Sequence, residues 1–75
     1  MVRFPGPPVS LSNHLAEHRK RHSLTQAQLA EAVGVSRKTI NTVENAVFIP
    51  STVLALKLAQ ALGTSVEALF ELDED

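Results

Sequence analysis

The chain has 75 residues, 44% of them hydrophobic, no cysteine and a formal net charge of −1. A chain of this length makes one domain that buries only about 60% of the surface exposed by its unfolded form, so an enzyme with a deep pocket is difficult to accommodate. The lack of cysteine excludes a disulfide framework and a thiolate site, and it predicts a reducing compartment, by default the cytoplasm.

The amino-terminal stretch MVRFPGPPVS carries three prolines, one cation and no apolar run. This composition is typical of neither a signal peptide nor a membrane span, and it predicts a flexible arm over residues 1–10. Apolar and histidine side chains then recur at spacings of four, three and four, at Leu11, Leu15, His18 and His22. The spacing predicts a first helix over residues 11–22.

Two further helices have clear start and stop signals. Thr25 can cap a helix over residues 26–33, and Gly34 can end it. Ser36 can cap the next helix, over residues 36–45. Together they make two short helices joined by a tight turn that contains glycine, which is the pattern of a helix-turn-helix.

The remaining chain predicts two more helices and an acidic tail. Pro50 keeps the preceding residue extended and Ser51 can cap a helix over residues 52–62. Thr64, followed three residues later by Glu67, is a capping-box pattern for a helix over residues 65–72. Without strand-like alternation, the sequence predicts an all-α domain of five short helices over residues 11–72, followed by the tail 73–75.

The helix over residues 36–45 has an unusual polar face. At about 100° per residue, Ser36, Ile40 and Val43 share the side that would face a core. The opposite and flanking positions carry only cations, amides and a hydroxyl, at Arg37, Lys38, Asn41, Thr42 and Asn45. Solvated helix faces usually mix charges of both signs, so this face favours an anionic partner, although an ordinary surface helix remains the alternative.

Charge is also divided along the chain. Residues 1–42 carry six Lys or Arg against two acids, whereas residues 43–75 carry one Lys against six acids. The two parts therefore have net charges of +4 and −5. This asymmetry predicts that one part of the protein faces an anionic partner.

The run LTQAQLAEAVGVSRKTINTVEN, followed by Pro50-Ser51, ALKLAQALG and SVEALF, resembles the Xre or Cro/repressor family of bacterial and phage DNA-binding domains, over about residues 13–72. The resemblance implies a compact repressor-like domain whose third helix enters the major groove of double-stranded DNA while the second lies across the backbone.

By position, the resemblance implies roles for eight residues. Gln26 would donate to a phosphate near the amino end of its helix. Arg37, Lys38 and Thr42 would read bases, and cationic side chains pair well with guanine O6 and N7. Ser36 and Thr39 would lie near the backbone or a thymine methyl, and Asn41 and Asn45 at the groove margin.

The sequence departs from the family at three positions. The family usually places glycine after the EN pair, where this chain has Ala46, so either Asn45 takes the left-handed role or the turn differs. Ser23 replaces a frequent glycine, and His18 stands where an aliphatic residue is common.

Glu44 lies on the core side of its helix, where a lone carboxylate would cost several kcal/mol to bury. Arg19 is the best candidate partner, and the family pairs Arg and Glu at these positions. We therefore predict a structural ion pair between Arg19 and Glu44.

The histidine repeat His14, His18 and His22 has a spacing that can present imidazoles to one metal ion. The neighbouring Arg19, Lys20 and Arg21 would repel a cation, and no carboxylate or cysteine accompanies the three. We therefore expect no metal site and no cofactor.

Two apolar groups remain for assembly. We expect Phe48 or Ile49 to pack into the core, with contact to the DNA sugar backbone as the alternative. The last predicted helix has more apolar surface than it needs, and Val66 and Leu69 are the predicted contact of a two-fold homodimer, formed at least on DNA.

The polar face of the helix over residues 36–45 and the resemblance to the Xre or Cro/repressor family together favour a sequence-specific transcriptional regulator that binds a palindromic operator. The competing hypothesis is an interaction module of the same fold, such as an antitoxin, whose acidic carboxyl-terminal half binds a partner protein. An enzyme is not supported, because no arrangement of Ser, His and acid and no pair of carboxylates lies in a plausible pocket.

Overall fold

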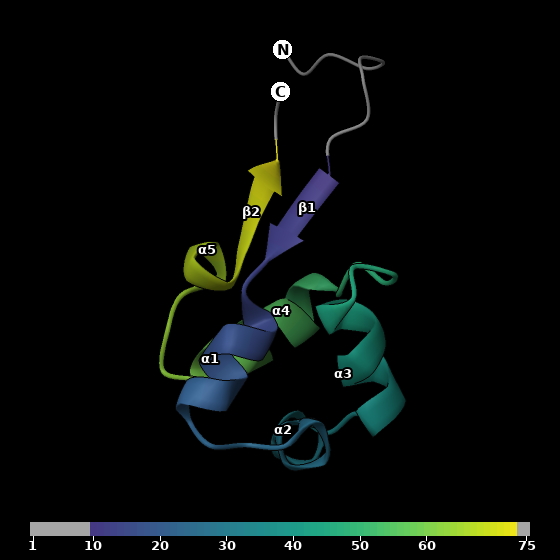
Figure 1. The fold of residues 1–75 in the computed structure, drawn as a ribbon, viewed down its shortest axis with the longest axis vertical. Coiled ribbons are helices and arrows are strands. Elements are labelled where there is room, and N and C mark those ends of the chain that lie inside the picture. The colour runs from purple at the N-terminus through teal and green to yellow at the C-terminus, as the bar shows by residue number, and fades with distance from the viewer. Residues whose placement is uncertain (1–9, 74–75) are drawn as a thin grey trace.

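The structure is a computed structural model and describes residues 10–73, so the predicted arm, apart from Ser10, and residues 74–75 lie outside the described residues. Along the chain, five helices lie between two strands, and the two strands pair in an antiparallel sheet (Figure 1). Their bounds are β1 Ser10–Asn13, α1 Leu15–Arg21, α2 Gln26–Val33, α3 Arg37–Glu44, α4 Thr52–Ala61, α5 Val66–Leu69 and β2 Phe70–Asp73. No helix within residues 10–73 has the length and apolar character needed to cross a membrane.

The capping signals place the middle three helices as predicted. The Thr25 side chain accepts from the Gln28 backbone N–H while the Gln28 side chain accepts from the Thr25 N–H, a full capping box at the start of α2. Ser36 and Ser51 accept from the third residue of α3 and α4, respectively. Each cap satisfies a backbone donor that would otherwise lack a partner in the first turn.

The two ends of the domain differ from the prediction. Residues 11–13 form a strand instead of the first turn of a helix, and residues 70–73 form a strand instead of the last turn of another. The strands pair with Leu11 opposite Leu72 and Asn13 opposite Phe70. Ser65, not Thr64, caps the short helix α5.

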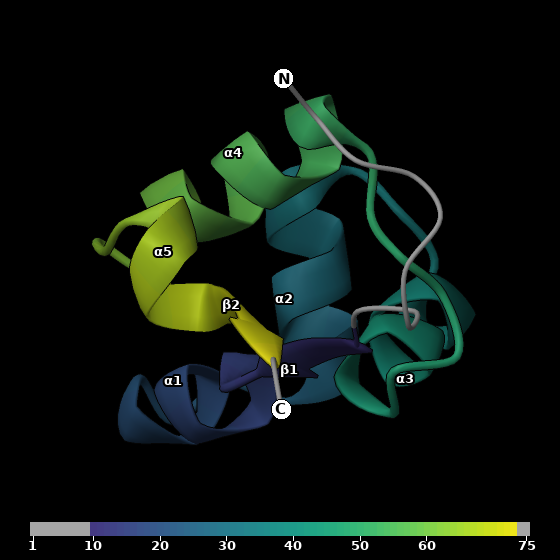
Figure 2. The ribbon, with the colours of Figure 1, turned by 90° about the horizontal axis from the view of Figure 1, so that it is seen from above.

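One core holds the helices and the base of the sheet together. Viewed down the long axis, α2 lies between α4 and α3 and packs against both (Figure 2). Among residues 10–73, the apolar residues buried in this core are Leu15, Leu29, Ala30, Val33, Ile40, Val43, Leu54, Ala55, Leu58, Ala59, Leu62, Leu69 and Phe70. This core fixes the angle between α2 and α3 and so positions the exposed face of α3.

The two residues that replace family glycines, Ser23 and Ala46, both have a left-handed backbone conformation. Ser23 has φ = 56° and Ala46 has φ = 59°, while Gly34, which ends α2, has φ = 76°. Ala46 therefore takes the left-handed role itself, and Asn45, with φ = −91°, does not. A left-handed backbone costs an L-residue about 1–2 kcal/mol.

We therefore expect Ala46→Gly to raise the free energy of unfolding by about 0.5–1 kcal/mol. Glycine removes the strain of the left-handed backbone, but it also raises the entropy of the unfolded chain, which offsets part of the stabilisation. The matched control is Ala32→Gly, at an exposed position inside α2, which should lower stability by about 1 kcal/mol. Urea unfolding of both variants tests this. Equal losses in the two variants would contradict the strain at Ala46.

Candidate functional site

Helices α2 and α3 form the predicted helix-turn-helix. Ala30 is buried where the two helices approach, and the Val35 backbone N–H donates to the Ala30 carbonyl across the turn at 3.0 Å. Ile40 and Val43 are fully or almost fully buried on the inner side of α3. The inner face of α3 is thereby fixed, and its outer face is left to solvent.

The outer face of α3 carries cations and neutral polar groups. Arg37, Lys38 and Asn45 are exposed, and Asn41 and Thr42 are half-buried. Thr42 Oγ1 donates to the Thr39 carbonyl at 2.9 Å, and Asn45 Nδ2 donates to the Asn41 carbonyl at 2.8 Å. These bonds hold two of the neutral side chains against their own helix.

The amino end of α3 is organised by two hydroxyls. Ser36 Oγ accepts from the Thr39 backbone N–H at 3.1 Å and also shares a hydrogen bond of 2.9 Å with Thr39 Oγ1. Arg37 and Lys38 follow directly, on the first turn of a helix whose free N–H groups favour anions. The start of α3 therefore combines a capped helix end with two exposed cations.

The predicted ion pair between Arg19 and Glu44 is confirmed. Arg19 Nε donates to Glu44 Oε2 at 2.6 Å and Arg19 NH2 donates to Oε1 at 3.2 Å, with the two side chains 11% and 6% exposed. Arg19 NH1 donates to the Leu24 carbonyl at 2.8 Å. One guanidinium thus joins α1 to the end of α3 and to the turn before α2.

Gln26 connects this ion pair to the outer face. Its Nε2 donates to Glu44 Oε1 at 2.9 Å, and its Oε1 accepts from Arg37 NH1 at 3.3 Å and from Asn41 Nδ2 at 3.5 Å. The structure therefore places Gln26, Arg37 and Asn41 together. Lys38 and Ser36 lie on the same helix end but outside this set of hydrogen bonds.

The predicted dimer contact at Leu69 is wrong in this structure. Leu69 is fully buried within the domain, because the chain turns into β2 immediately after it and places it against the core. Of the predicted pair, Val66 alone is partly exposed to solvent, because it packs at the edge of the core.

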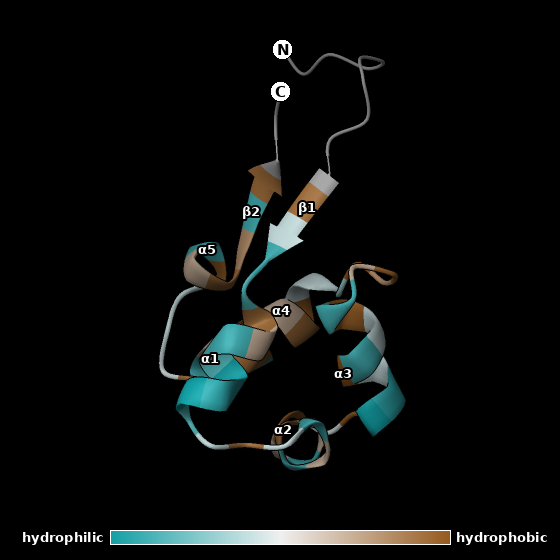
Figure 3. Ribbon diagram, in the orientation of Figure 1, coloured by the Kyte–Doolittle hydropathy of each residue, from teal (hydrophilic) through white to brown (hydrophobic). Residues whose placement is uncertain are grey.

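The prediction for the loop after α3 is also wrong. Phe48 is 48% and Ile49 is 74% exposed, so neither packs into the core. Figure 3 colours part of this loop as hydrophobic. The backbone N–H groups of Val47 and Phe48 both donate to the Thr42 carbonyl, which holds the start of this loop against the end of α3.

Sequence analysis missed an apolar surface on α4. Val53 and Leu56 are 62% and 55% exposed, and Leu56 borders a hollow of about 550 Å³. The other residues lining this hollow are mostly apolar, with Thr52 and Glu67 as the polar members: Leu11, Ile49, Pro50, Thr52, Ala55, Val66, Glu67 and Phe70. The signal was present in the sequence, since Val53 and Leu56 fall outside the helical stripe of Leu54, Leu58 and Leu62.

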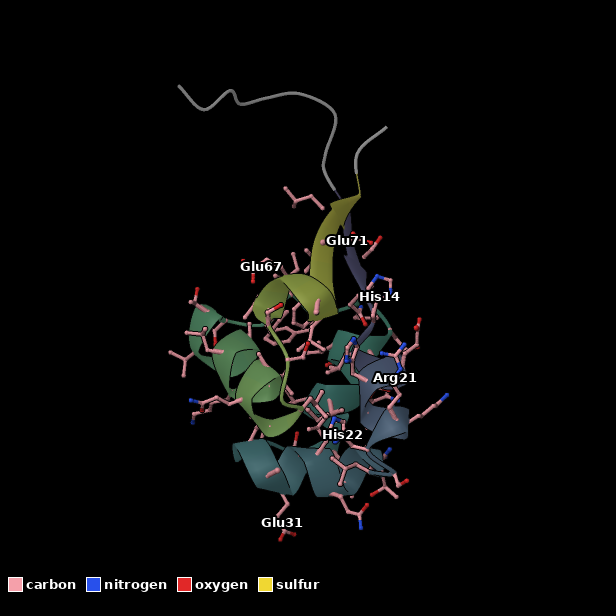
Figure 4. All side chains as sticks on the ribbon, turned by 90° about the vertical axis from the view of Figure 1, so that its left-hand side faces the viewer. His14, Arg21, His22, Glu31, Glu67 and Glu71 are labelled. Atoms are coloured by element: carbon pink, nitrogen blue, oxygen red, sulfur yellow. The ribbon has the colours of Figure 1, made fainter. Side chains whose placement is uncertain are left out.

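The three histidines do not converge. Within residues 10–73, no three His, Cys, Asp or Glu side chains gather closely enough to hold a metal ion. Contrary to the expectation that no carboxylate accompanies the histidines, His14 lies beside Glu71 at the junction of β1 and α1 (Figure 4). Its hydrogen bond to Glu71, at 3.2 Å, and a second contact with Glu17, at 3.5 Å, raise the pKa of His14 above its ordinary value.

Known proteins are similar to this chain in sequence. The helix-turn-helix family model matches residues 15–69. An uncharacterized HTH-type transcriptional regulator of Methanothermobacter thermautotrophicus is 50% identical over 62 residues, covering 81% of this chain and 90% of the relative. The HTH-type transcriptional regulator YgzD of Bacillus subtilis, also uncharacterized, is 37% identical over 65 residues, covering 87% and 98%.

A solved structure agrees in fold. The clp gene regulator ClgR of Corynebacterium glutamicum superimposes with a TM-score of 0.67 and 33% identity, over 69% of this chain. The match spans 55% of the ClgR chain, so this protein corresponds to about half of that regulator.

Proposed function

Because the chain belongs to the helix-turn-helix family of DNA-binding transcriptional regulators, we propose that it binds a palindromic operator as a homodimer, with α3 in the major groove. Arg37, Lys38 and Thr42 read base edges, and Asn41 and Asn45 lie at the groove margin. Ser36 and Thr39 lie near the backbone or a thymine methyl, and Gln26 donates to a phosphate. In a cell the protein acts where DNA is, in the cytoplasm.

The observation that carries this proposal is the position of the single acid on α3. Glu44 is turned inward and neutralised by Arg19, so the outer face of the helix presents Arg37 and Lys38 without a carboxylate of its own. Two cations that have no ion-pair partner among residues 10–73 and lie beside amides and hydroxyls suit both phosphates and the acceptor edge of guanine.

Selection of bound sequences from a random DNA pool tests the proposal. We expect an enriched motif with two related half-sites, and an affinity that falls steeply as salt rises, because cations release counterions from phosphates. Recovery of no motif, together with a partner protein that copurifies in stoichiometric amount, would contradict it and favour the interaction module.

The homodimer requires a surface away from α3. A single recognition helix reads only a few base pairs, so specificity needs two half-sites about 34 Å apart on one face of the duplex. We assign the contact to the exposed apolar surface formed by Ile49, Val53, Leu56 and Val66, since Leu69 is buried. A second copy would cover these side chains in a two-fold, self-complementary contact.

We expect Leu56→Glu to weaken operator binding and remove its cooperativity, because it places two carboxylates in the apolar contact. Titration of a two-half-site duplex in a mobility-shift experiment measures this, with circular dichroism as the check of folding. The matched control is Gln60→Glu, which adds the same charge at another exposed position of α4 and should keep cooperativity. Cooperative binding by a folded Leu56→Glu variant would exclude this surface.

A further inference from the structure

Gln26 is the one residue of α2 whose side chain reaches both the ion pair and the recognition face, among the hydrogen bonds of residues 10–73. It stands at the first position of α2, and its amide contacts Glu44 on one side and Arg37 and Asn41 on the other. Glu44 is nearly buried, whereas Arg37 is exposed. The amide therefore bridges an interior carboxylate and the base-reading end of α3.

The chemistry of Glu44 decides which way this amide points. A carboxylate paired with Arg19 only accepts hydrogen bonds, so the group of Gln26 that faces it must be the NH2. The opposite orientation would place the Gln26 carbonyl oxygen against a carboxylate oxygen of Glu44. Both atoms are acceptors, so no hydrogen bond could form between them. With the NH2 directed to Glu44, the carbonyl oxygen must face α3.

The oxygen turned toward α3 meets two donors. Arg37 NH1 and Asn41 Nδ2, one helical turn apart, both point at Gln26 Oε1, at 3.3 and 3.5 Å. In the described residues the hydrogen bonds of Arg37 use only NH1. Its Nε and NH2 edge is therefore free for the paired acceptors of guanine.

We propose that Glu44 and Gln26 form a relay that sets DNA sequence specificity: the buried carboxylate fixes the orientation of the Gln26 amide, and that amide holds Arg37 and Asn41 in position for readout. Both are positioning residues, since neither reads a base itself. The inference rests on the proposed function, because it assumes that Arg37 reads a base pair. It also gives Gln26 a role that a phosphate contact alone does not include.

Binding measurements on Gln26→Met separate these roles, because methionine keeps the length of the side chain and removes both hydrogen-bonding groups. The readout is the ratio of dissociation constants for the operator and for operators changed at one base pair. We expect the ratio at the base pair read by Arg37 to fall about 2- to 10-fold, the range for one lost hydrogen bond, while ratios at other positions stay within about two-fold. In the Arg37→Ala background, Gln26→Met should cause no further fall at that position.

The matched control is Gln28→Met, which breaks the capping box of the same helix without contact to α3 and should leave every ratio unchanged. Uniform weakening across all sequences by Gln26→Met, with unchanged ratios, would overturn the relay and leave a phosphate contact. If Arg37→Ala itself leaves all ratios unchanged, the assignment of Arg37 in the proposed function fails as well, so the two failures are distinguishable.

The orientation of the Gln26 amide can also be tested in the free protein, without DNA. We expect the side-chain amide protons of Gln26 to exchange with water more slowly than those of the exposed Gln60, because one of them is bonded to Glu44. Nuclear magnetic resonance measures both rates in one sample. Equal rates would overturn the fixed orientation of the amide.

Discussion

Arg19→Leu is expected to lower the free energy of unfolding by about 3–5 kcal/mol, the largest effect among these variants. The substitution leaves the Glu44 carboxylate, 6% exposed, without its cation. It also removes the donor to the Leu24 carbonyl at the start of the turn before α2. Gln26 alone cannot replace two charge-assisted bonds, so the fold can keep the carboxylate hydrated only by shifting the end of α3 toward water.

The double variant Arg19→Leu with Glu44→Leu tests the reason for this loss. With both charges gone, no buried ion remains, and packing of two leucines recovers much of the stability. Urea unfolding of wild type, both single variants and the double variant gives the coupling energy. Single variants as stable as wild type would show that the pair is solvated in solution.

Arg37→Ala is expected to cost about 1–3 kcal/mol of binding at one base pair and to relax specificity there. The side chain is exposed, and within residues 10–73 its one hydrogen bond is the bond to Gln26, so the fold should keep its stability. Selection from random DNA with wild type and variant shows the change as one degenerate position in each half-site.

Lys20→Ala is the control for charge, because Lys20 is an exposed cation on α1, outside the recognition helix. It removes one positive charge, as Arg37→Ala does, and should leave the selected motif intact. An unchanged motif in the Arg37→Ala selection would contradict the base-reading role of Arg37.

The parts of the structure with local signals were predicted from the sequence. Thr25, Ser36 and Ser51 each lie just before an apolar pattern and accept a hydrogen bond from the new helix, so α2, α3 and α4 begin where expected. The Arg19–Glu44 pair was also predicted, because a carboxylate on a core-facing position requires a partner and the family resemblance supported Arg19 as that partner.

The β-sheet was not predicted, because nothing local distinguishes it. Each strand has four residues, too few for periodicity to separate a strand from a helix turn. Leu11 and Leu72 meet only when the two ends of the chain come together. The burial of Leu69 follows from this pairing, and so does the error in the predicted dimer contact.

Within the candidate site, the residue types were predicted and their connections were not. A helical wheel was enough to predict which residue types lie on the outer face of α3. The bridge from Glu44 through Gln26 to Arg37 depends on the angle between α2 and α3, which the packing of Ala30, Ile40 and Val43 sets. A sequence pattern contains no information on that angle.

The most direct test of the central claim, that α3 reads the major groove at two half-sites, is methylation interference on the selected operator. Guanine N7 lies in the major groove and adenine N3 in the minor groove, so a methyl group at either position reports which groove the protein enters. We predict that N7 methylation blocks binding at two clusters centred about 10 base pairs apart. Interference from adenine N3 alone, or from no base, would contradict the account.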